Sequence, residues 1–137
     1  MMSIQKTFSD IRGRIDSSVS RGLKVKAKRI ADYTVMISPV YSGAYVESFS
    51  IKARGEGGGR SRSSDARDAK ERSPDPDRHK MIALDQLYSD ITALGTEKID
   101  GFVLRNRSPH VREVENGSIE NNVPAHKVFE RVRRNFG

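Results

Sequence analysis

The chain contains no cysteine and no tryptophan among its 137 residues. The lack of cysteine excludes disulfide frameworks, zinc ribbons, iron–sulfur clusters and thiol nucleophiles. Only five Phe and four Tyr are present, and hydrophobic residues make up 35% of the chain, so a domain of this length has a thin core. We therefore expect a single domain over residues 1–137 whose stability is supplemented by contacts with other subunits.

Long apolar runs are also missing. No window approaches the roughly eighteen apolar residues that a transmembrane helix needs. The N-terminal stretch MMSIQKTFSDIRGR lacks the continuous apolar core of a secretion signal. We expect a soluble protein with no membrane partner and no export signal.

The net charge of +7 is unevenly distributed. Residues 1–37 carry a net +5 and the tail from His126 carries +3, whereas residues 81–125 carry −3. An excess of positive charge suits nucleic acid, an anionic membrane or an acidic protein. Because the two signs are separated, head-to-tail contact between copies is favoured at least as well as a DNA-binding face.

Two long segments show the spacing of apolar residues that is typical of amphipathic helices. The first runs from Ile4 to Val35 and ends before Pro39, because proline disfavours helical geometry in the preceding residue. Its apolar positions are Ile4, Phe8, Ile11, Ile15, Val19, Leu23, Ala27, Ile30, Thr34 and Val35. The second begins with Asp77 as N-cap and ends at Gly95. Its apolar positions are Met81, Leu84, Leu87, Tyr88, Ile91 and Leu94.

Two strands are predicted. Alternation at Phe49, Ile51 and Ala53 indicates a half-buried strand, preceded by a short helical piece at residues 44–47. The segment KIDGFVLRN indicates a second strand at residues 99–105, either continuous or as a hairpin that turns at Asp100-Gly101. The sheet is therefore antiparallel or mixed.

The segment NRSPHVREVENG predicts a short helix. Ser108 suits the cap, Pro109 the first helical position and Gly117 the end, while Val111 and Val114 form the apolar face.

A short C-terminal helix follows Pro124, with Val128, Phe129 and Val132 on its apolar face. The predicted fold class is α+β: a long N-terminal helix and a second helix packed on a small antiparallel or mixed β-sheet, a short C-terminal helix and a long insert loop.

The insert covers residues 54–78 and contains no Val, Ile, Leu, Met, Phe or Tyr. Such a segment cannot recover its ordering entropy by burial, so we expect a flexible or extended loop. Its GEGGGR stretch lacks the Gly-Lys-Ser/Thr continuation of a phosphate-binding loop, which favours a linker over a nucleotide site.

No constellation of residues indicates an enzyme. His110, Glu113 and Glu115 do not share one helical face and lack a metal-ligand spacing with His126, so a solvated helix surface is favoured over a metal or acid–base site. Ser42 and Ser48 lack the nucleophile-elbow pattern. We expect no catalytic residues, no metal and no cofactor.

Clusters of Lys and Arg are the remaining candidates for a binding surface. The stretch RGLKVKAKR suits phosphate contacts, but no aromatic residues are interleaved there, which favours a solvated face or contact with acidic residues of a neighbouring subunit. The candidate contacts to another subunit or to DNA are Arg21, Lys24, Lys28, Arg29, Arg60, Arg62, Arg131, Arg133 and Arg134.

The order of these segments resembles the neck and tail-completion proteins of tailed bacteriophages, a group of small tail components. After a long helix, such proteins have a Pro-Val-x-Thr/Ser-Gly turn, which SPVYSGAYVESF resembles. An Asn-x-x-Pro element and a Pro-Ala-x-x-Phe segment follow, similar to NRSPHVREVENG and PAHKVFERV. Residues 4–136 share this order, apart from the insert. The matching positions are Pro39, Ser42, Gly43, Asn106, Pro109, Glu115, Gly117 and Pro124.

The resemblance implies a non-enzymatic virion protein that forms a ring, often a hexamer, at the junction of head and tail. It implies contacts with other neck proteins, such as a connector, adaptor or stopper, and with the tail tube protein, and assembly in the host cytoplasm. We hypothesise that the insert and the C-terminal tail dock on adjacent subunits or on the tail tube. Two alternatives are a small basic DNA-binding module that uses the N-terminal helix, and a ring whose basic residues touch passing DNA.

Overall fold

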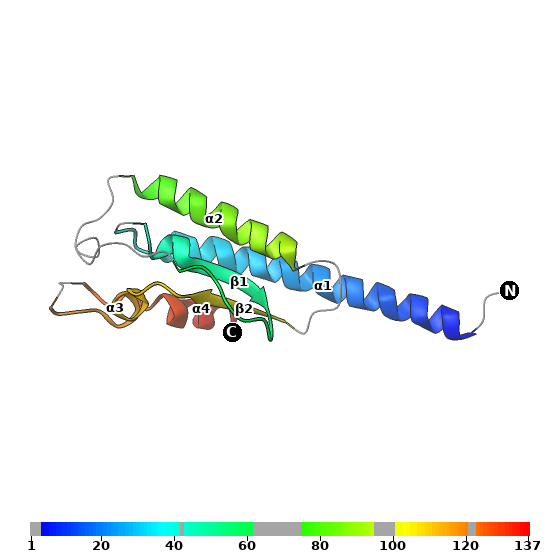
Figure 1. Ribbon diagram of the computed structural model, residues 1–137. Helices are drawn as coiled ribbons and strands as arrows, with labels where there is room; N and C mark the ends of the chain where they lie inside the picture. Colours follow the sequence, from blue (N-terminus) through cyan, green and yellow to red (C-terminus); the bar gives the residue numbers. More distant parts are fainter. Residues whose placement is uncertain (1–3, 42, 62–74, 95–100, 121–122) are drawn as a thin grey trace.

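In a computed structural model the chain has an α+β fold, in which helices surround a two-stranded antiparallel sheet (Figure 1). The structure describes residues 4–41, 43–61, 75–94, 101–120 and 123–137, and for residues 4–20 the helical backbone alone. The predicted fold class is therefore confirmed, with the antiparallel form of the sheet.

Helix α1 (Ile4–Ile37) is the long N-terminal helix that the apolar spacing predicts. It ends where the Ser38 hydroxyl donates to the Thr34 carbonyl at 2.6 Å and Pro39 follows. The N-terminal half of α1 extends beyond the other elements (Figure 1). Its buried side chains, in the described part, begin at Ala27.

The sheet pairs β1 (Phe49–Ala53) with β2 (Phe102–Asn106), and the 3-10 helix η1 (Val46–Ser48) precedes β1. The first strand is confirmed. The second begins at Phe102 rather than at Ile99, which lies outside the described residues together with Asp100. The partner of β2 is β1, and not a strand joined to it by a turn at Asp100-Gly101.

Helix α2 (Pro76–Ala93) is confirmed as an element, but its predicted cap is wrong. Asp75, not Asp77, accepts the backbone N–H of Arg78 at 3.3 Å, and Pro76 occupies the first turn, where its missing N–H costs no hydrogen bond. Residues 76–78 thus belong to the helix and not to the insert loop.

The buried face of α2 also differs from the predicted one. It is formed by Ala83, Leu87, Ile91 and Leu94. Met81 lies on the opposite side and is 66% exposed, because a residue two positions before Ala83 is turned by about 200° around the helix.

Two short helices complete the chain, α3 (Val111–Asn116) and α4 (Val128–Phe136). The Ser108 hydroxyl accepts the N–H of His110 at 3.2 Å, and His110 is the N-cap residue, so Pro109 precedes α3 instead of starting it. Helix α3 therefore begins two residues later than predicted, because Ser108 stabilises the turn that leads into it.

The core lies where α1, α2 and β1 meet, and α4 contacts α1 as well. In Figure 1, α1 runs between α2 on one side and α4 on the other. The buried core residues are Ala27, Ala31, Val35, Val40, Tyr45, Val46, Phe49, Ile51, Ala83, Leu87, Ile91, Leu94, Val114 and Val128. Most are small or β-branched, which agrees with the thin core expected from the composition.

Candidate functional site

Asn106 joins the first two of the three segments that carry the family resemblance. Its side-chain amide donates to the Tyr45 carbonyl at 2.8 Å, and its side-chain oxygen accepts the N–H of Ser108 at 2.9 Å. The amide thus satisfies the N–H of Ser108 after β2 and gives a second donor to the carbonyl of Tyr45 before η1, which also accepts the N–H of Ser48. Asn106 is a structural residue that connects the turn before β1 to the turn before α3.

Glu115 joins the second segment to the third. Its carboxylate accepts the backbone N–H groups of Phe129 at 2.9 Å and Glu130 at 3.4 Å, in the first turn of α4. Lys127, the N-cap residue of α4, has a φ of +52° and provides no side-chain cap, so Glu115 takes that role from 14 residues away. The expectation that Glu115 lies on a solvated surface was wrong.

Tyr41 and His126 join the first segment to the third. The Tyr41 hydroxyl and His126 Nε2 are 2.9 Å apart, and the two rings meet edge to face with centroids at 6.1 Å. These residues are separated by 85 positions in the sequence. The backbone N–H of His126 also donates to the Val114 carbonyl at 2.8 Å. The imidazole is therefore part of a contact that joins the first segment to the third.

Tyr45 lies at the centre of these contacts. Its ring packs edge to face on Phe49 with centroids 5.2 Å apart, and its hydroxyl is buried with no hydrogen-bond partner among the described residues. Burial raises the pKa of the Tyr45 phenol, and the negative charge of Glu115 raises it further. Tyr45 remains a neutral phenol and cannot act as a base at ordinary pH.

Two glycines of the resemblance occupy positions that exclude a side chain. Gly43 has a φ of +96°, and a Cβ there would lie 2.2 Å from Nδ1 of His79, which contacts Glu47 Oε2 at 3.0 Å. Gly117 has a φ of +82°, and a Cβ there would lie 2.9 Å from the backbone N of Ala125. Only glycine fits such close contact at a positive φ.

The other residues of the resemblance differ in their surroundings. Pro39 is buried at the end of α1, whereas Pro109 and Pro124 are exposed. Ser42 lies outside the described residues. Together, the matched residues that the structure describes make backbone and packing contacts, and nothing in their arrangement brings a nucleophile to a base.

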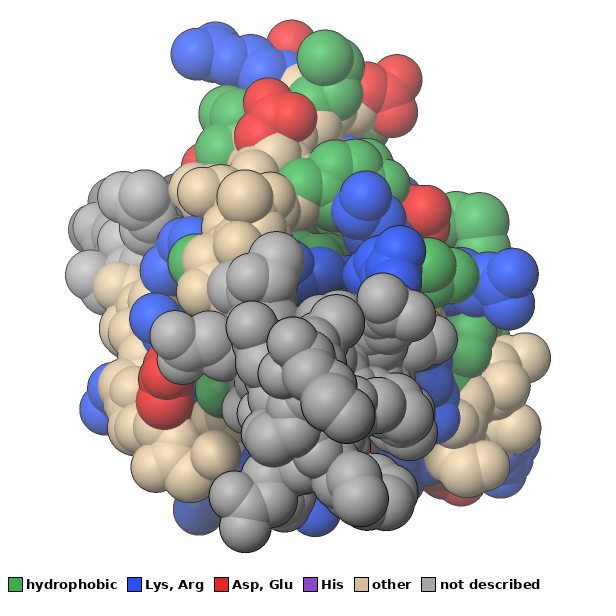
Figure 2. All heavy atoms as spheres, turned by 90° about the vertical axis from the view of Figure 1, so that its right-hand side faces the viewer, with side chains coloured by type: hydrophobic (Ala, Val, Ile, Leu, Met, Phe, Trp, Pro, Cys, Tyr) green, Lys and Arg blue, Asp and Glu red, His purple; other side chains and the backbone are tan. Residues whose placement is uncertain are grey.

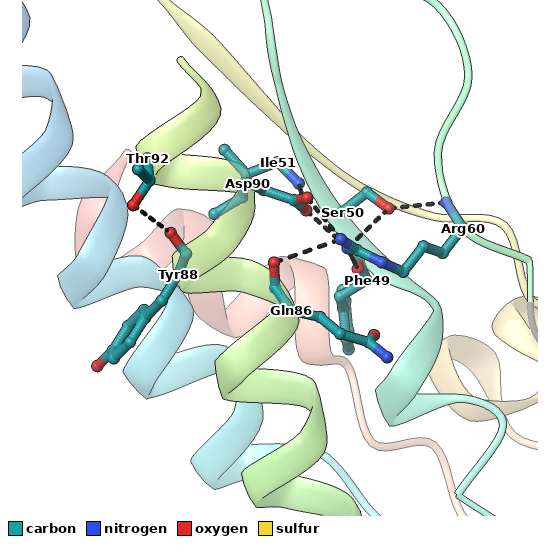
Figure 3. A network of polar contacts seen from close by, with 8 residues as sticks. All are labelled: Phe49, Ser50, Ile51, Arg60, Gln86, Tyr88, Asp90 and Thr92. Carbon is teal, nitrogen blue, oxygen red and sulfur yellow. Dashed lines mark hydrogen bonds and ion pairs between the residues drawn. The ribbon is translucent and has the colours of Figure 1, made fainter. Parts of the chain in front are cut away.

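Arg60 and Asp90 form a second cluster that the sequence analysis did not foresee (Figure 3). The guanidinium donates to both carboxylate oxygens, at 2.7 and 2.5 Å, and to the Phe49 carbonyl at 3.0 Å. Asp90 also accepts the N–H of Ile51 at 3.0 Å, and Ser50 Oγ accepts the N–H of Arg60 at 2.7 Å.

This ion pair closes the outer edge of β1. In an antiparallel pair, alternate residues turn their backbone groups away from the partner strand. The carbonyl of Phe49 and the N–H of Ile51 point outward in this way and are satisfied by Arg60 and Asp90 (Figure 3). A second effect is that Ser50 is buried, although alternation predicted an exposed position.

The Arg60–Asp90 pair corrects two expectations. Arg60 is bound within its own subunit, so it is not a candidate contact to DNA or to a neighbour. The described part of the insert, residues 54–61, is attached to β1 and α2 rather than free. Asp90 itself was detectable in the sequence, since it lies between Leu87 and Ile91 on the buried side of α2 and a carboxylate there needs a partner.

The other basic candidates lie on α1 and α4. Arg21, Lys28, Arg29, Arg131 and Arg133 are exposed and Lys24 is half-buried. Arg134 pairs with Glu130 at 2.7 Å, and Arg62 lies outside the described residues. Helix α4 packs on its own α1, so the described part of the C-terminal tail is docked within the subunit.

Figure 2 shows the molecule from the N-terminal end of α1. At the top, where α2 lies in Figure 1, carboxylates and apolar side chains stand beside a Lys or Arg side chain, and further Lys and Arg side chains occur on the flanks and below. Carboxylates also occur at the lower left, so charges of both signs are mixed on this face.

In the part of the chain that the structure describes, no three His, Asp or Glu side chains are grouped as metal ligands. Among the described helices, none has a stretch long and apolar enough to cross a bilayer. No protein-family model, no curated protein and no solved structure matches the chain.

Proposed function

We propose that this protein is a structural, non-enzymatic component of the head–tail junction of a tailed bacteriophage: a neck, tail-completion or tail-terminator protein. In this role it assembles as a ring, with six subunits the expected number, and connects the head connector to the tail. Its partners are then copies of itself, other neck proteins and the tail tube protein, and its location is the virion.

One observation carries the proposal. The three short segments that carry the family resemblance lie far apart in the sequence and contact one another through Asn106, Glu115 and the Tyr41–His126 pair. Two of the matched residues, Asn106 and Glu115, make such contacts, which supports a shared structural role for the matched segments. Their contacts are structural, which supports a protein that provides shape rather than chemistry.

The surface of α1 and α2 supports contact with a neighbouring subunit. Met36 and Met81 are 63% and 66% exposed. Lys80, next to Met81, donates to the Met36 carbonyl at 2.9 Å, so the two methionines lie on adjacent helices. Exposed apolar side chains that lie together on adjacent elements mark interaction sites more often than single ones do. We place a contact between subunits at this pair.

The test combines assembly with location. The mass of the purified full chain is measured by light scattering, rings are sought by negative-stain microscopy, and the protein is located in phage particles by cryo-electron microscopy. Rings, and density at the collar, are the expected results. Density elsewhere in the particle, or substrate turnover that a substitution of His110 abolishes, would overturn the proposal.

A matched pair of variants tests the contact itself. Met36→Glu/Met81→Glu places charge in the proposed interface and should abolish ring formation. Ile119→Glu changes the most exposed large apolar side chain among the described residues, 102% exposed on the loop after α3, and should leave assembly unchanged. If both variants assemble like the unmodified chain, the interface lies elsewhere.

A further inference from the structure

Helices α1 and α4 bring basic residues from the two ends of the sequence onto one surface. His126, before α4, contacts Tyr41, and Asn135, near the end of α4, donates to the Tyr33 hydroxyl at 2.7 Å. The ring of Phe136 meets Tyr33 with centroids 5.5 Å apart. Helix α4 therefore runs antiparallel to α1, with its C-terminal end at Tyr33.

Beyond this contact, α1 continues with basic residues on the same side. Arg29 and Lys26 precede Tyr33 by four and seven positions, the spacing that places residues on one face of a helix. On α4, Arg131 lies one turn before Asn135, whose side chain also donates to the Arg131 carbonyl at 2.9 Å. Arg134, two positions after the buried Val132, is turned by about 200° from it and points away from α1.

We name the three residues Lys26, Arg29 and Arg131 the α1–α4 row. All three are exposed. Lys26, Arg29 and Arg131 make no ion pair among the described residues, whereas Arg134 is bound to Glu130. Asp32, the nearest acidic residue of α1, is bound on the other side by the hydroxyl of Tyr88. The three residues of the row thus present positive charge without an ion-paired carboxylate among the described residues.

The dimensions of the row suit a nucleic acid backbone. Lys26 lies seven residues before Tyr33 on α1. Arg131 lies four residues before Asn135 on the antiparallel α4, and therefore on the far side of Tyr33 from Lys26. The two distances add up to about 16 Å along the helix axes. Over that length a DNA strand presents about five phosphates. The row contains no aromatic residue, and Tyr33 and Phe136 beside it pack edge to face against each other and are half-buried, so the row lacks the interleaved stacking rings of a single-strand site. A duplex is therefore favoured over a single strand.

We infer that the α1–α4 row binds the phosphate backbone of duplex DNA without sequence specificity. A protein partner is less suited, because the large exposed apolar residues of the described chain are Val25, Met36, Met81, Tyr88 and Ile119, and none belongs to the row. This inference does not depend on ring assembly, and its failure would leave the proposed function standing.

The proposed DNA contacts differ in part from the basic residues that the sequence singled out. Lys24 and Lys28 precede Arg29 but point to other sides of α1. On α4, Arg133 lies about 160° around the helix from Asn135, which contacts Tyr33, and Arg134 lies opposite the buried Val132. Lys26, which was not among the candidate contacts from the sequence, belongs to the row instead. Only the packing of α4 on α1 makes this selection.

The experiment measures binding of the full chain to a fluorescein-labelled 30-base-pair duplex of random sequence by anisotropy, over a series of salt concentrations. The row variant is Lys26→Gln/Arg29→Gln/Arg131→Gln. The control variant, Arg54→Gln/Arg78→Gln/Arg112→Gln, removes the same charge from exposed positions elsewhere. Circular dichroism verifies that both variants keep the fold.

The expected result is binding that weakens steeply with salt. Each lost phosphate contact reduces the log–log slope by about 0.9, so the row variant should lose about 2.7 of the slope and on the order of a hundred-fold in affinity at 0.1 M salt. The control variant should retain most of the salt slope and most of the affinity. Arg131→Gln should weaken binding more than Arg133→Gln, which tests the contribution of α4 separately.

Three results would overturn the inference. The first is no binding by the unmodified chain at 50 mM salt. The second is equal loss in the row and control variants, since net charge alone would then explain binding. The third is displacement of the duplex by poly-glutamate at equal charge concentration, which would indicate a surface for acidic proteins.

Discussion

The Arg60–Asp90 ion pair should be the contact that holds residues 54–61 on the domain, and its removal allows a quantitative prediction. The side chains are 25% and 10% exposed. Asp90→Ala leaves the largely covered Arg60 guanidinium without its carboxylate and leaves the N–H of Ile51 without its acceptor. Breaking a buried ion pair by removing one partner costs about 3–5 kcal/mol, and partial exposure of Arg60 reduces this to about 2–3 kcal/mol.

The reverse change is expected to cost less. Arg60→Ala leaves Asp90 with the N–H of Ile51, and water can enter where the guanidinium was, so we expect about 1–2 kcal/mol. In the double variant the two losses should not add, because each single change already breaks the same interaction. The coupling energy should be about 1–2 kcal/mol.

Urea denaturation followed by circular dichroism gives the free energy of unfolding for the four proteins of this cycle. The matched control is Asp85→Ala on the exposed side of α2, which should change stability by less than about 0.5 kcal/mol. If Asp90→Ala is as mild as the control, or if the two losses add fully, the ion pair does not hold residues 54–61 and the reasoning is refuted.

Three further changes have outcomes that follow from the contacts. Glu115→Ala removes the cap of α4 and should lower the free energy of unfolding by about 1 kcal/mol, whereas Glu120→Ala on an exposed loop should not; equal effects would exclude the capping role. Gly43→Ala should cost more than 1 kcal/mol, because it combines a positive φ with a clash against His79; a melting temperature like that of the unmodified protein would contradict this. The raised pKa of Tyr45 means that its unfolded form ionises first, so its contribution to stability is full below about pH 10 and is lost as the pH rises further. Tyr45→Phe should change stability little at pH 7 and lessen the alkaline decline, and an unchanged pH profile of unfolding would argue against this assignment.

Local rules predicted most of the elements. Apolar spacing located α1, α2 and α4, since amphipathic helices bury one stripe whatever they pack against. The cap of α2 was misplaced because Asp75 and Asp77 both suit the position by residue type. Pro76 distinguishes them, since proline favours the first turn of a helix and therefore makes the residue before it the cap.

The candidate site was less accessible from the sequence. The order of the motifs identified four of its residues, Gly43, Asn106, Glu115 and Gly117. It did not identify their roles, and Glu115 was expected on a solvated surface. A carboxylate that caps a helix 14 residues away has no local signature. The same holds for Arg60, whose partner on α2 lies 30 residues further on.

The sequence by itself determined the α+β class, the thin core and the positions of the long helices, because periodicity and composition act within a few turns of chain. Tertiary structure alone decided that β1 pairs with β2, that Arg60 binds Asp90, and that α4 lies along α1. Those contacts join residues 30 to more than 100 positions apart. Which distant partners meet depends on how all the buried faces pack together, and no local pattern contains that information.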